Sequence, residues 1–207
     1  FPTRRSSVLQ KNDSLNRDRL IEMCRSFYNL NSWKNLKRTS KLALTRSQAE
    51  KDDYFIGHSY RWLGIYYQKM DLKDSAFYYY LKAEKIFKKL NNKFFLCHLY
   101  IDKALVLHYT CNYMEAEAAL VSALKIANEL NIKYEITKIY MILGMNSSNQ
   151  KDYISTFKYY QKALNLTNGE SGEKFKISQI IILNNMAINY FYVNEYRRAL
   201  LFHTESL

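Results

Sequence analysis

The sequence predicts an all-α fold in which about five helical hairpins follow one another along the chain. Breakers of regular structure are scarce, because the 207 residues include only five glycines and one proline. Such scarcity disfavours an all-β fold with many tight turns. Small and large side chains also recur with a period of about 40 residues, and apolar residues recur at spacings of three and four, as amphipathic helices require.

The recurring pattern is clearest in residues 60–83. Gly64, Tyr67, Ala76, Tyr80 and Ala83 stand there at offsets 0, 3, 12, 16 and 19. The same offsets start again at Cys24, Ala104, Gly144 and Ala187, so successive anchors differ by 40, 40, 40 and 43 residues. Small residues at offsets 0, 12 and 19 let two antiparallel helices approach closely, and larger residues at offsets 3 and 16 fill the space between them. We therefore expect Ala76 and Ala116 to be buried where helices cross.

This register places the helices in order along the chain. The first helix of each hairpin is expected near residues 15–30, 52–69, 93–110, 133–149 and 174–192. The second helix of each hairpin is expected near residues 33–49, 73–90, 113–130, 152–167 and 195–207. The junctions KKLNNK at 88–93 and NELNIK at 128–133 carry Asn, which is tolerated where a helix ends and the chain turns.

The segment TNGESGEK, residues 167–174, is the glycine-rich part of the sequence. It supplies the extra three residues of the fourth spacing. A phosphate-binding loop would need the pattern GxxxxGK[ST] after a strand, and Gly169 and Gly172 do not fit that pattern. We therefore interpret the segment as a longer loop between two hairpins.

The quoted residues resemble the tetratricopeptide repeat (TPR) family, whose hairpin carries a small residue at the centre of its first helix and an A…F/Y…A pattern on its second. The resemblance covers residues 15–207, with repeats near 15–49, 52–90, 93–130, 133–167 and 174–207. It implies an α-solenoid of about five hairpins wound as a right-handed superhelix. The period exceeds the family's usual length of about 34 residues, and this longer form resembles repeat domains of bacterial signalling proteins, including peptide-sensing regulators and sensor kinases.

The two ends of the sequence are interpreted separately from the repeats. Residues 1–9, FPTRRSSVL, differ only at Val8 from the translation of a common sequencing-adapter end, so we interpret them as a non-native tail. A short disordered tail is the alternative. The solenoid is then expected to occupy residues 10–207. Because a solenoid normally ends in a capping helix with a polar outer face, we expect the last repeat to be truncated and the sequence to be a fragment.

The charge and the hydropathy of the sequence bear on its partners. The net charge of +12 is uneven, since residues 1–50 carry +7 and residues 104–207 carry +1. The basic residues are spread singly along the predicted helices, as on a solvated face, and no groove-reading motif accompanies them, so we do not expect nucleic acid as a partner of this fragment. A nucleic-acid role would need the Lys and Arg residues to converge on one surface. No apolar run is as long as a transmembrane helix requires, so no membrane segment is expected within the sequence.

Catalytic and metal-binding motifs are not found in the sequence. HExxH, GxSxG, kinase-loop and Walker patterns are missing, so we expect no enzyme activity of this fragment and no cofactor. Cys24, Cys97 and Cys111 are far apart, which argues against a disulfide framework or a zinc site and favours a reducing, cytoplasmic compartment. A periplasmic location is the alternative if the full protein is a membrane sensor. His58 and His98 stand one period apart, and we interpret them as groove-lining polar residues, with a metal site between repeats as the alternative.

The resemblance implies a binding surface on the concave face, which the first helices line. When the central small residue is counted as position 8, positions 2, 5, 9 and 12 face inward in the family. These positions correspond to His58, Arg61, Ile65 and Gln68, to His98, Ile101, Leu105 and His108, and to Lys138, Met141, Met145 and Ser148. Such a mixed groove would suit an extended or helical peptide, although each member has packing against the neighbouring repeat as its alternative. Arg61 is followed by Ile65 where a carboxylate clamp would need Asn, so an acidic chain terminus is not the expected ligand.

These observations predict a protein- or peptide-binding module that forms the sensory or scaffolding part of a larger bacterial regulator. Two alternatives stay open. The chain could be the repeat region of a sensor histidine kinase whose catalytic part lies outside this sequence. It could also belong to a peptide-sensing or nucleic-acid-linked transcription regulator.

Overall fold

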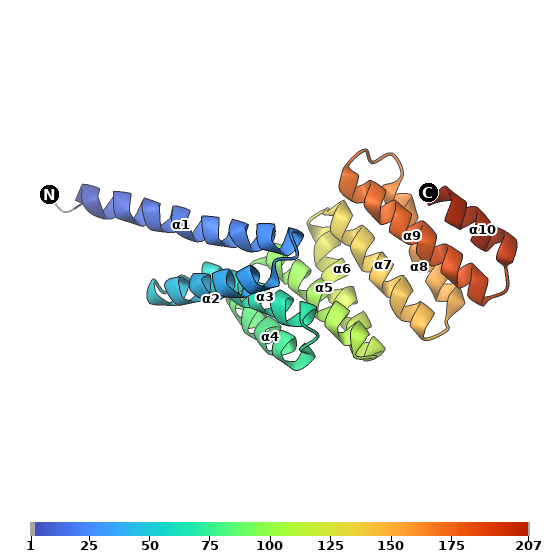
Figure 1. The fold of residues 1–207 in the computed structure, drawn as a ribbon, viewed down its shortest axis with the longest axis horizontal. Coiled ribbons are helices and arrows are strands. Elements are labelled where there is room, and N and C mark those ends of the chain that lie inside the picture. Colours follow the sequence, from blue (N-terminus) through green and yellow to red (C-terminus); the bar gives the residue numbers. More distant parts are fainter. Residues whose placement is uncertain (1–2, 207) are drawn as a thin grey trace. The chain divides into compact units, whose positions relative to one another are not determined.

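A computed structural model describes the backbone of residues 3–206 and the side chains of residues 16–206. These residues form ten α-helices and no strand (Figure 1). The helices are α1 (Thr3–Asn29), α2 (Trp33–Ala49), α3 (Asp53–Lys69), α4 (Lys73–Lys89), α5 (Lys93–Tyr109), α6 (Tyr113–Glu129), α7 (Lys133–Asn149), α8 (Tyr153–Thr167), α9 (Glu173–Tyr192) and α10 (Tyr196–Glu205). The expected all-α fold of consecutive hairpins is confirmed.

The interpretation of residues 1–9 as a non-native tail falls largely outside the described residues. Residues 1 and 2 are not described, and residues 3–9 are described only as backbone within α1. That interpretation therefore stays a prediction. The first helix begins earlier than the expected residue 15, whereas the other helices begin and end within a few residues of the expected bounds.

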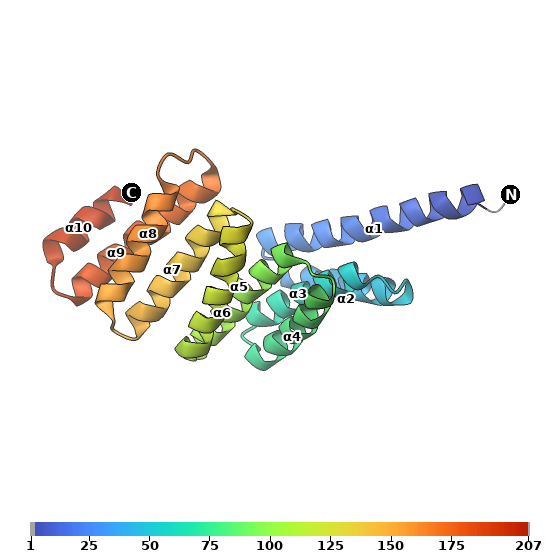
Figure 2. The same cartoon turned by 180° about the vertical axis from the view of Figure 1, so that it is seen from behind.

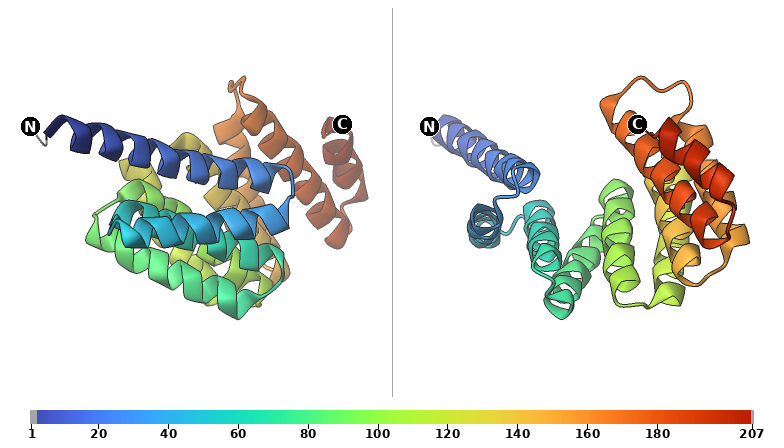
Figure 3. Two further views of the ribbon diagram at one scale, coloured as in Figure 1. Left: turned by 60° about the vertical axis from the view of Figure 1, so that its left-hand side comes forward. Right: turned by 45° about the vertical axis from the view of Figure 1, so that its right-hand side comes forward.

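The chain divides into two compact units, one up to Asp102 and the other from Lys103 onward. In the first unit α1 packs against α2, α2 against α3 and α3 against α4, and α1 also contacts α3. Figure 3 shows α1 and α2 as one antiparallel hairpin. In the second unit α6, α7, α8, α9 and α10 contact one another in sequence, and α7 also contacts α9, as Figures 1 and 2 show from opposite sides. In each unit, therefore, the first helices of neighbouring hairpins lie side by side.

One kind of turn explains the period of the sequence. A residue with positive φ follows each of the first seven helices, and these residues are Asn31, Lys51, Asp71, Asn91, Cys111, Asn131 and Lys151. The next amide donates to the carbonyl five residues earlier, as from Ser32 to Phe27 (2.8 Å) and from Asp152 to Ser147 (2.9 Å). This is the Schellman pattern, which satisfies carbonyls at a helix end. Because each of α2 to α7 has 17 residues and the positive-φ residues stand 20 apart, two helices and two turns give the 40-residue period.

The connection between α8 and α9 is longer than these turns. It holds Gly169 at φ +77°, a conformation that glycine adopts without steric cost. Lys133 Nζ at the start of α7 lies 2.5 Å from Glu170 Oε1 and ties the loop to that helix. The expected longer loop is confirmed.

The predicted register also describes the core. Ala76 and Ala116 are fully buried, as expected, and so are Ala83, Ala123 and Ala163. A Cβ atom on Gly144 would lie 2.6 Å from the Tyr160 ring, and a Cβ atom on Gly64 would clash with the Tyr80 ring. In these two hairpins the glycine at offset 0 is therefore required by the tyrosine at offset 16.

The fifth copy of the pattern is the least buried. Ala199 is half-buried and His203 is exposed, and no residue of α10 itself is fully buried. In α4, α6 and α8 the corresponding positions are buried. The difference arises because no described helix packs against the outer face of α10. Among the described residues, no helix combines the length and the apolar character that crossing a bilayer would need.

Candidate functional site

A cavity of about 450 Å³ opens on the first helices of the first unit. Pockets that bind small ligands or side chains commonly have volumes of roughly 300–1,000 Å³. The cavity is lined by Asp18, Arg19, Ile21, Glu22 and Arg25 of α1, by Tyr54, Phe55 and His58 of α3, and by Phe95 of α5. Its walls therefore come from three successive hairpins.

The α3 residues of the cavity are positioned by a helix cap. The Asp52 carboxylate accepts hydrogen bonds from the backbone amides of Tyr54 (3.1 Å) and Phe55 (3.3 Å). An aspartate at this position satisfies amides that have no partner within the helix. The Asn92 side chain caps α5 in the same way by accepting from the amide of Phe95 (3.2 Å). Both caps fix the first turns that carry the aromatic side chains.

His58 lies at the centre of these aromatic rings. Its ring centroid is 4.0 Å from that of Phe95, 4.6 Å from that of Tyr54 and 5.5 Å from that of Phe87, and all three contacts are edge-to-face. The side chain is only 5% exposed, and its Nε2 atom has no hydrogen-bond partner among the described residues. Burial lowers the pKa of His58 to about 3, with smaller contributions from the charges of Arg61 and Arg25. The imidazole is therefore neutral at physiological pH.

The α1 wall of the cavity is charged and is held in place by Arg17. The Arg17 guanidinium pairs with the Glu50 carboxylate, lies 3.4 Å from Asp52 Oδ2, and stands 5.0 Å from the centre of the Phe55 ring. These contacts attach α1 to the turn between α2 and α3. On the cavity side, burial raises the pKa of Tyr54, and the charges of Asp18 and Asp52 raise it further, so its hydroxyl stays protonated.

The structure places the predicted groove residues of the first unit in different surroundings. His58 lines the cavity, while Arg61 Nε lies 2.6 Å from Asp102 Oδ2 on α5. Gln68 accepts a hydrogen bond from the Tyr80 hydroxyl (2.7 Å). Ile65 and Ile101 are buried, and His98 is half-buried with its ring 4.6 Å from that of Phe94.

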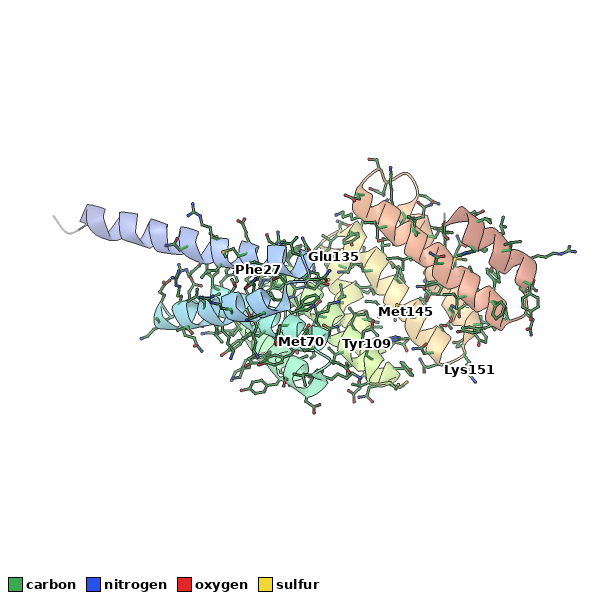
Figure 4. All side chains as sticks on the ribbon, in the orientation of Figure 1. Phe27, Met70, Tyr109, Glu135, Met145 and Lys151 are labelled. Atoms are coloured by element: carbon green, nitrogen blue, oxygen red, sulfur yellow. The ribbon has the colours of Figure 1, made fainter. Side chains whose placement is uncertain are left out.

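The predicted groove residues of the second unit are also engaged in contacts. His108 Nδ1 lies 2.6 Å from Asn146 Oδ1, and the Ser148 hydroxyl donates to Asn189 Oδ1 (2.6 Å). Lys138 stands 5.7 Å from the centre of the Tyr134 ring, and Leu105 is half-buried. Met141 and Met145 pack against a cluster of Tyr160, Ala163, Ile182 and Met186. Figure 4 shows Met145 on α7, between Glu135 near the start of that helix and Lys151 in the turn after it.

Of the twelve predicted positions, the cavity includes only His58. The other cavity residues were not predicted from the sequence, although one signal for them was present. Phe55 and Phe95 stand one period apart, each three positions before a histidine of the predicted groove. A second signal lies in α1, because Asp18 and Arg25 stand one period before His58 and Ile65, two positions of the predicted groove.

The cysteines and other metal-ligating groups give no site in the described part of the chain. Cys24 and Cys97 are buried and Cys111 is exposed, and none of the three forms a disulfide bond. Burial raises the pKa of Cys24 to about 12, so this thiol stays protonated. No three His, Cys, Asp or Glu side chains of the described residues lie close enough together to hold a metal ion.

Comparisons with known proteins identify the fold. No family model matches the chain, and no curated protein matches it. The crystal structure of BtubC (BKLC) from P. vanneervenii matches with a TM-score of 0.81 at 16% identity, covering 98% of this chain and 84% of that chain. The structure of PilF from Pseudomonas aeruginosa matches with a TM-score of 0.71 at 16% identity, covering 95% of this chain and 78% of that chain. Both are TPR-like helical repeat proteins, so the chain has a TPR-like helical repeat fold.

Proposed function

We propose that the chain is a protein- or peptide-binding module and that the first helices of its first unit carry the binding surface. The observation that supports this proposal is the cavity between α1, α3 and α5, which is lined by aromatic and charged side chains and by His58. Aromatic side chains that line a pocket contribute strongly to protein interfaces. A TPR-like scaffold without a recognisable catalytic constellation is consistent with a binding role rather than with enzyme activity.

The wider setting of the module is part of the same proposal. We infer that it forms the sensory or scaffolding part of a larger bacterial regulator. The long repeat period supports this inference, since it resembles that of the repeat domains of bacterial signalling proteins. Three cysteines that form no disulfide bond support a reducing, cytoplasmic location.

Two tyrosine variants of the full chain test the location of the binding surface. Tyr54 lines the cavity on α3, whereas Tyr78 is 52% exposed on α4, does not line the cavity and serves as the matched control. A partner recovered with the wild-type chain is titrated against Tyr54→Ala and Tyr78→Ala by calorimetry. Tyr54→Ala should weaken binding about fivefold or more, which corresponds to a loss of about 1 kcal/mol, and Tyr78→Ala should leave the affinity unchanged. Loss of affinity in Tyr78→Ala alone, or equal affinities in both variants, would overturn the proposal.

A further inference from the structure

The loop between α8 and α9 contains an asparagine followed by a glycine in a tight turn (Figure 1). Asn168 has φ −64° and ψ 131°, and Gly169 has φ +77°. The Glu170 amide donates to the Thr167 carbonyl (3.2 Å), which closes the turn. These values describe a type II turn, in which glycine is preferred at the third position because φ is positive there. Asn168 and Gly169 are therefore the two central residues of the turn.

Two groups of this turn that can react with each other are exposed and form no other bond. Asn168 and Gly169 are both exposed, and a Cβ atom on Gly169 would have nothing within 4 Å apart from its own chain neighbours. The Gly169 amide belongs to the central peptide of the turn. Neither this amide nor the Asn168 side chain forms a hydrogen bond with another described residue. No hydrogen bond within the described part of the chain therefore has to break before the two groups meet.

Rotation of the central peptide plane brings these two groups together. The Gly169 nitrogen reaches the side-chain carbonyl carbon of Asn168 only after ψ of Asn168 has turned away from 131°. Rotating this one plane changes ψ of Asn168 and φ of Gly169 together and leaves the two ends of the turn in place. Glycine accepts φ of either sign, whereas a residue with a Cβ atom would resist part of this change. The glycine also presents its nitrogen without a side chain beside it.

We propose that Asn168 is a site of spontaneous deamidation, a covalent modification in which water is the other reactant. Hydroxide removes the proton of the Gly169 amide, and the nitrogen attacks Cγ of Asn168. The bond between Cγ and Nδ2 then breaks, Nδ2 takes up a proton from water, and ammonia leaves behind a five-membered succinimide ring. Water opens this ring at either of its carbonyl carbons. Opening at Cγ gives aspartate, and opening at the backbone carbonyl carbon gives isoaspartate.

The modification changes the charge and the length of the loop. Either product replaces a neutral amide with a carboxylate close to Glu170, whose own carboxylate lies 2.5 Å from Lys133 Nζ. Isoaspartate also lengthens the main chain by one carbon atom, because the chain then runs through Cβ and Cγ of the residue. The inference does not depend on the proposed function, since the loop belongs to the second unit and the cavity lies on helices α1, α3 and α5.

Incubation of the full chain at physiological temperature and pH, followed by tryptic digestion and mass spectrometry, measures the reaction. The tryptic peptide 163–174 contains both Asn165 and Asn168. A synthetic peptide of the same sequence gives the rate in a chain that holds no fixed turn. We expect Asn168 of the folded chain to react within about tenfold of the peptide rate, which corresponds to a barrier difference of at most about 1.4 kcal/mol. Isoaspartate should be among the products, and the rate should rise in proportion to the hydroxide concentration.

Three variants separate the effect of the turn from that of the dipeptide sequence. Asn168→Gln keeps an amide but would need a six-membered ring, so deamidation at this position should disappear. Gly169→Ala places a Cβ atom beside the attacking nitrogen and should slow the reaction about tenfold or more. Leu166→Gly is the matched control, because it puts glycine after Asn165 inside α8, where backbone amides are hydrogen-bonded. In that variant Asn165 should react at least about tenfold more slowly than Asn168. Circular dichroism confirms that each variant is folded before incubation.

Any of four results would contradict the proposal. A rate at Asn168 more than about tenfold below that of the peptide would show that the folded turn keeps the two groups apart. Aspartate as the only product would indicate direct hydrolysis of the side-chain amide without a ring. An unchanged rate in Gly169→Ala would show that the Gly169 nitrogen is not the attacking group. Equal rates at Asn165 and Asn168 in Leu166→Gly would show that the turn has no part in the reaction.

Discussion

His58 in the first unit and His108 in the second are both buried, and both stand on first helices of their hairpins, yet their surroundings differ. His108 uses both ring nitrogens, since Nδ1 lies 2.6 Å from Asn146 Oδ1 and Nε2 lies 3.4 Å from the Asn149 side-chain nitrogen. His58 has aromatic neighbours and an unpartnered Nε2 beside a cavity. The same residue type on the same scaffold therefore joins two helices in one unit and is packed among aromatic rings in the other.

Replacing a buried alanine of the repeat should destabilise the two units by similar amounts. Ala76 of α4 and Ala116 of α6 are fully buried at the same repeat position. Replacing either with Leu inserts a large side chain where helices approach closely, so each variant should lose about 1–3 kcal/mol of unfolding free energy. Urea denaturation followed by circular dichroism measures the loss. A large loss in only one unit would show that the repeat register is not equivalent in the two.

The two histidines should respond differently to the same substitution. His108→Phe leaves Asn146 Oδ1 buried without a hydrogen-bond partner, which should cost about 1–3 kcal/mol of unfolding free energy. His58→Phe replaces an imidazole whose Nε2 has no partner, and the cavity beside it accommodates the larger ring, so it should cost less than about 1 kcal/mol. Urea midpoints of the two variants give the comparison. Similar losses in both would mean that the His58 imidazole stabilises the folded chain through its polar atoms.

Lowering the pH should destabilise the first unit because His58 is buried as a neutral imidazole. Its pKa is about 3 in the folded chain against an ordinary value of 6.5, so the folded state binds fewer protons than the unfolded state. The stabilising effect is complete above pH 6.5 and is lost as the pH falls from there toward 3. Between pH 7 and pH 5 the wild type should lose about 2 kcal/mol more than His58→Phe. This difference depends little on the exact pKa of His58 in the folded chain, because any pKa well below 5 gives nearly the same loss of unfolding free energy.

Urea denaturation of both proteins at the two pH values measures this effect. The His58→Phe variant serves as the control for all other titrating groups, since it keeps them unchanged. Parallel losses in the wild type and in the variant would show that His58 is protonated in the folded chain at pH 5. They would also weaken the view that this imidazole is neutral in the cavity.

The sequence predicted the fold well and the candidate site only in part. A repeating pattern in which small residues face aromatic ones, as Gly144 faces Tyr160, depends only on contacts within one hairpin, so it can be recognised along the chain. The direction of a groove side chain depends on the neighbouring hairpin as well. Arg61 was predicted to face a ligand, and its contact in the structure is with Asp102 on the first helix of the next hairpin. The cavity depends in addition on charged residues of α1 such as Asp18 and Arg25, whose side-chain types do not recur at the corresponding positions His58 and Ile65 of the next repeat.

The smallest expected change in stability comes from substitutions in the turns, and it should be similar in the two units. Lys51 in the first unit and Lys151 in the second have φ of 56° and 60°, which a side chain with a Cβ atom adopts at a steric cost. Replacing either with Gly removes that cost but increases the freedom of the unfolded chain, so the net gain should be about 0.5–1 kcal/mol for each. Thermal unfolding of the single variants and of the double variant measures the gain, which should be additive because the turns are independent. A loss of stability in either variant would show that the lysine side chain itself stabilises its turn, and a gain confined to one variant would extend the difference between the units from the site to the scaffold.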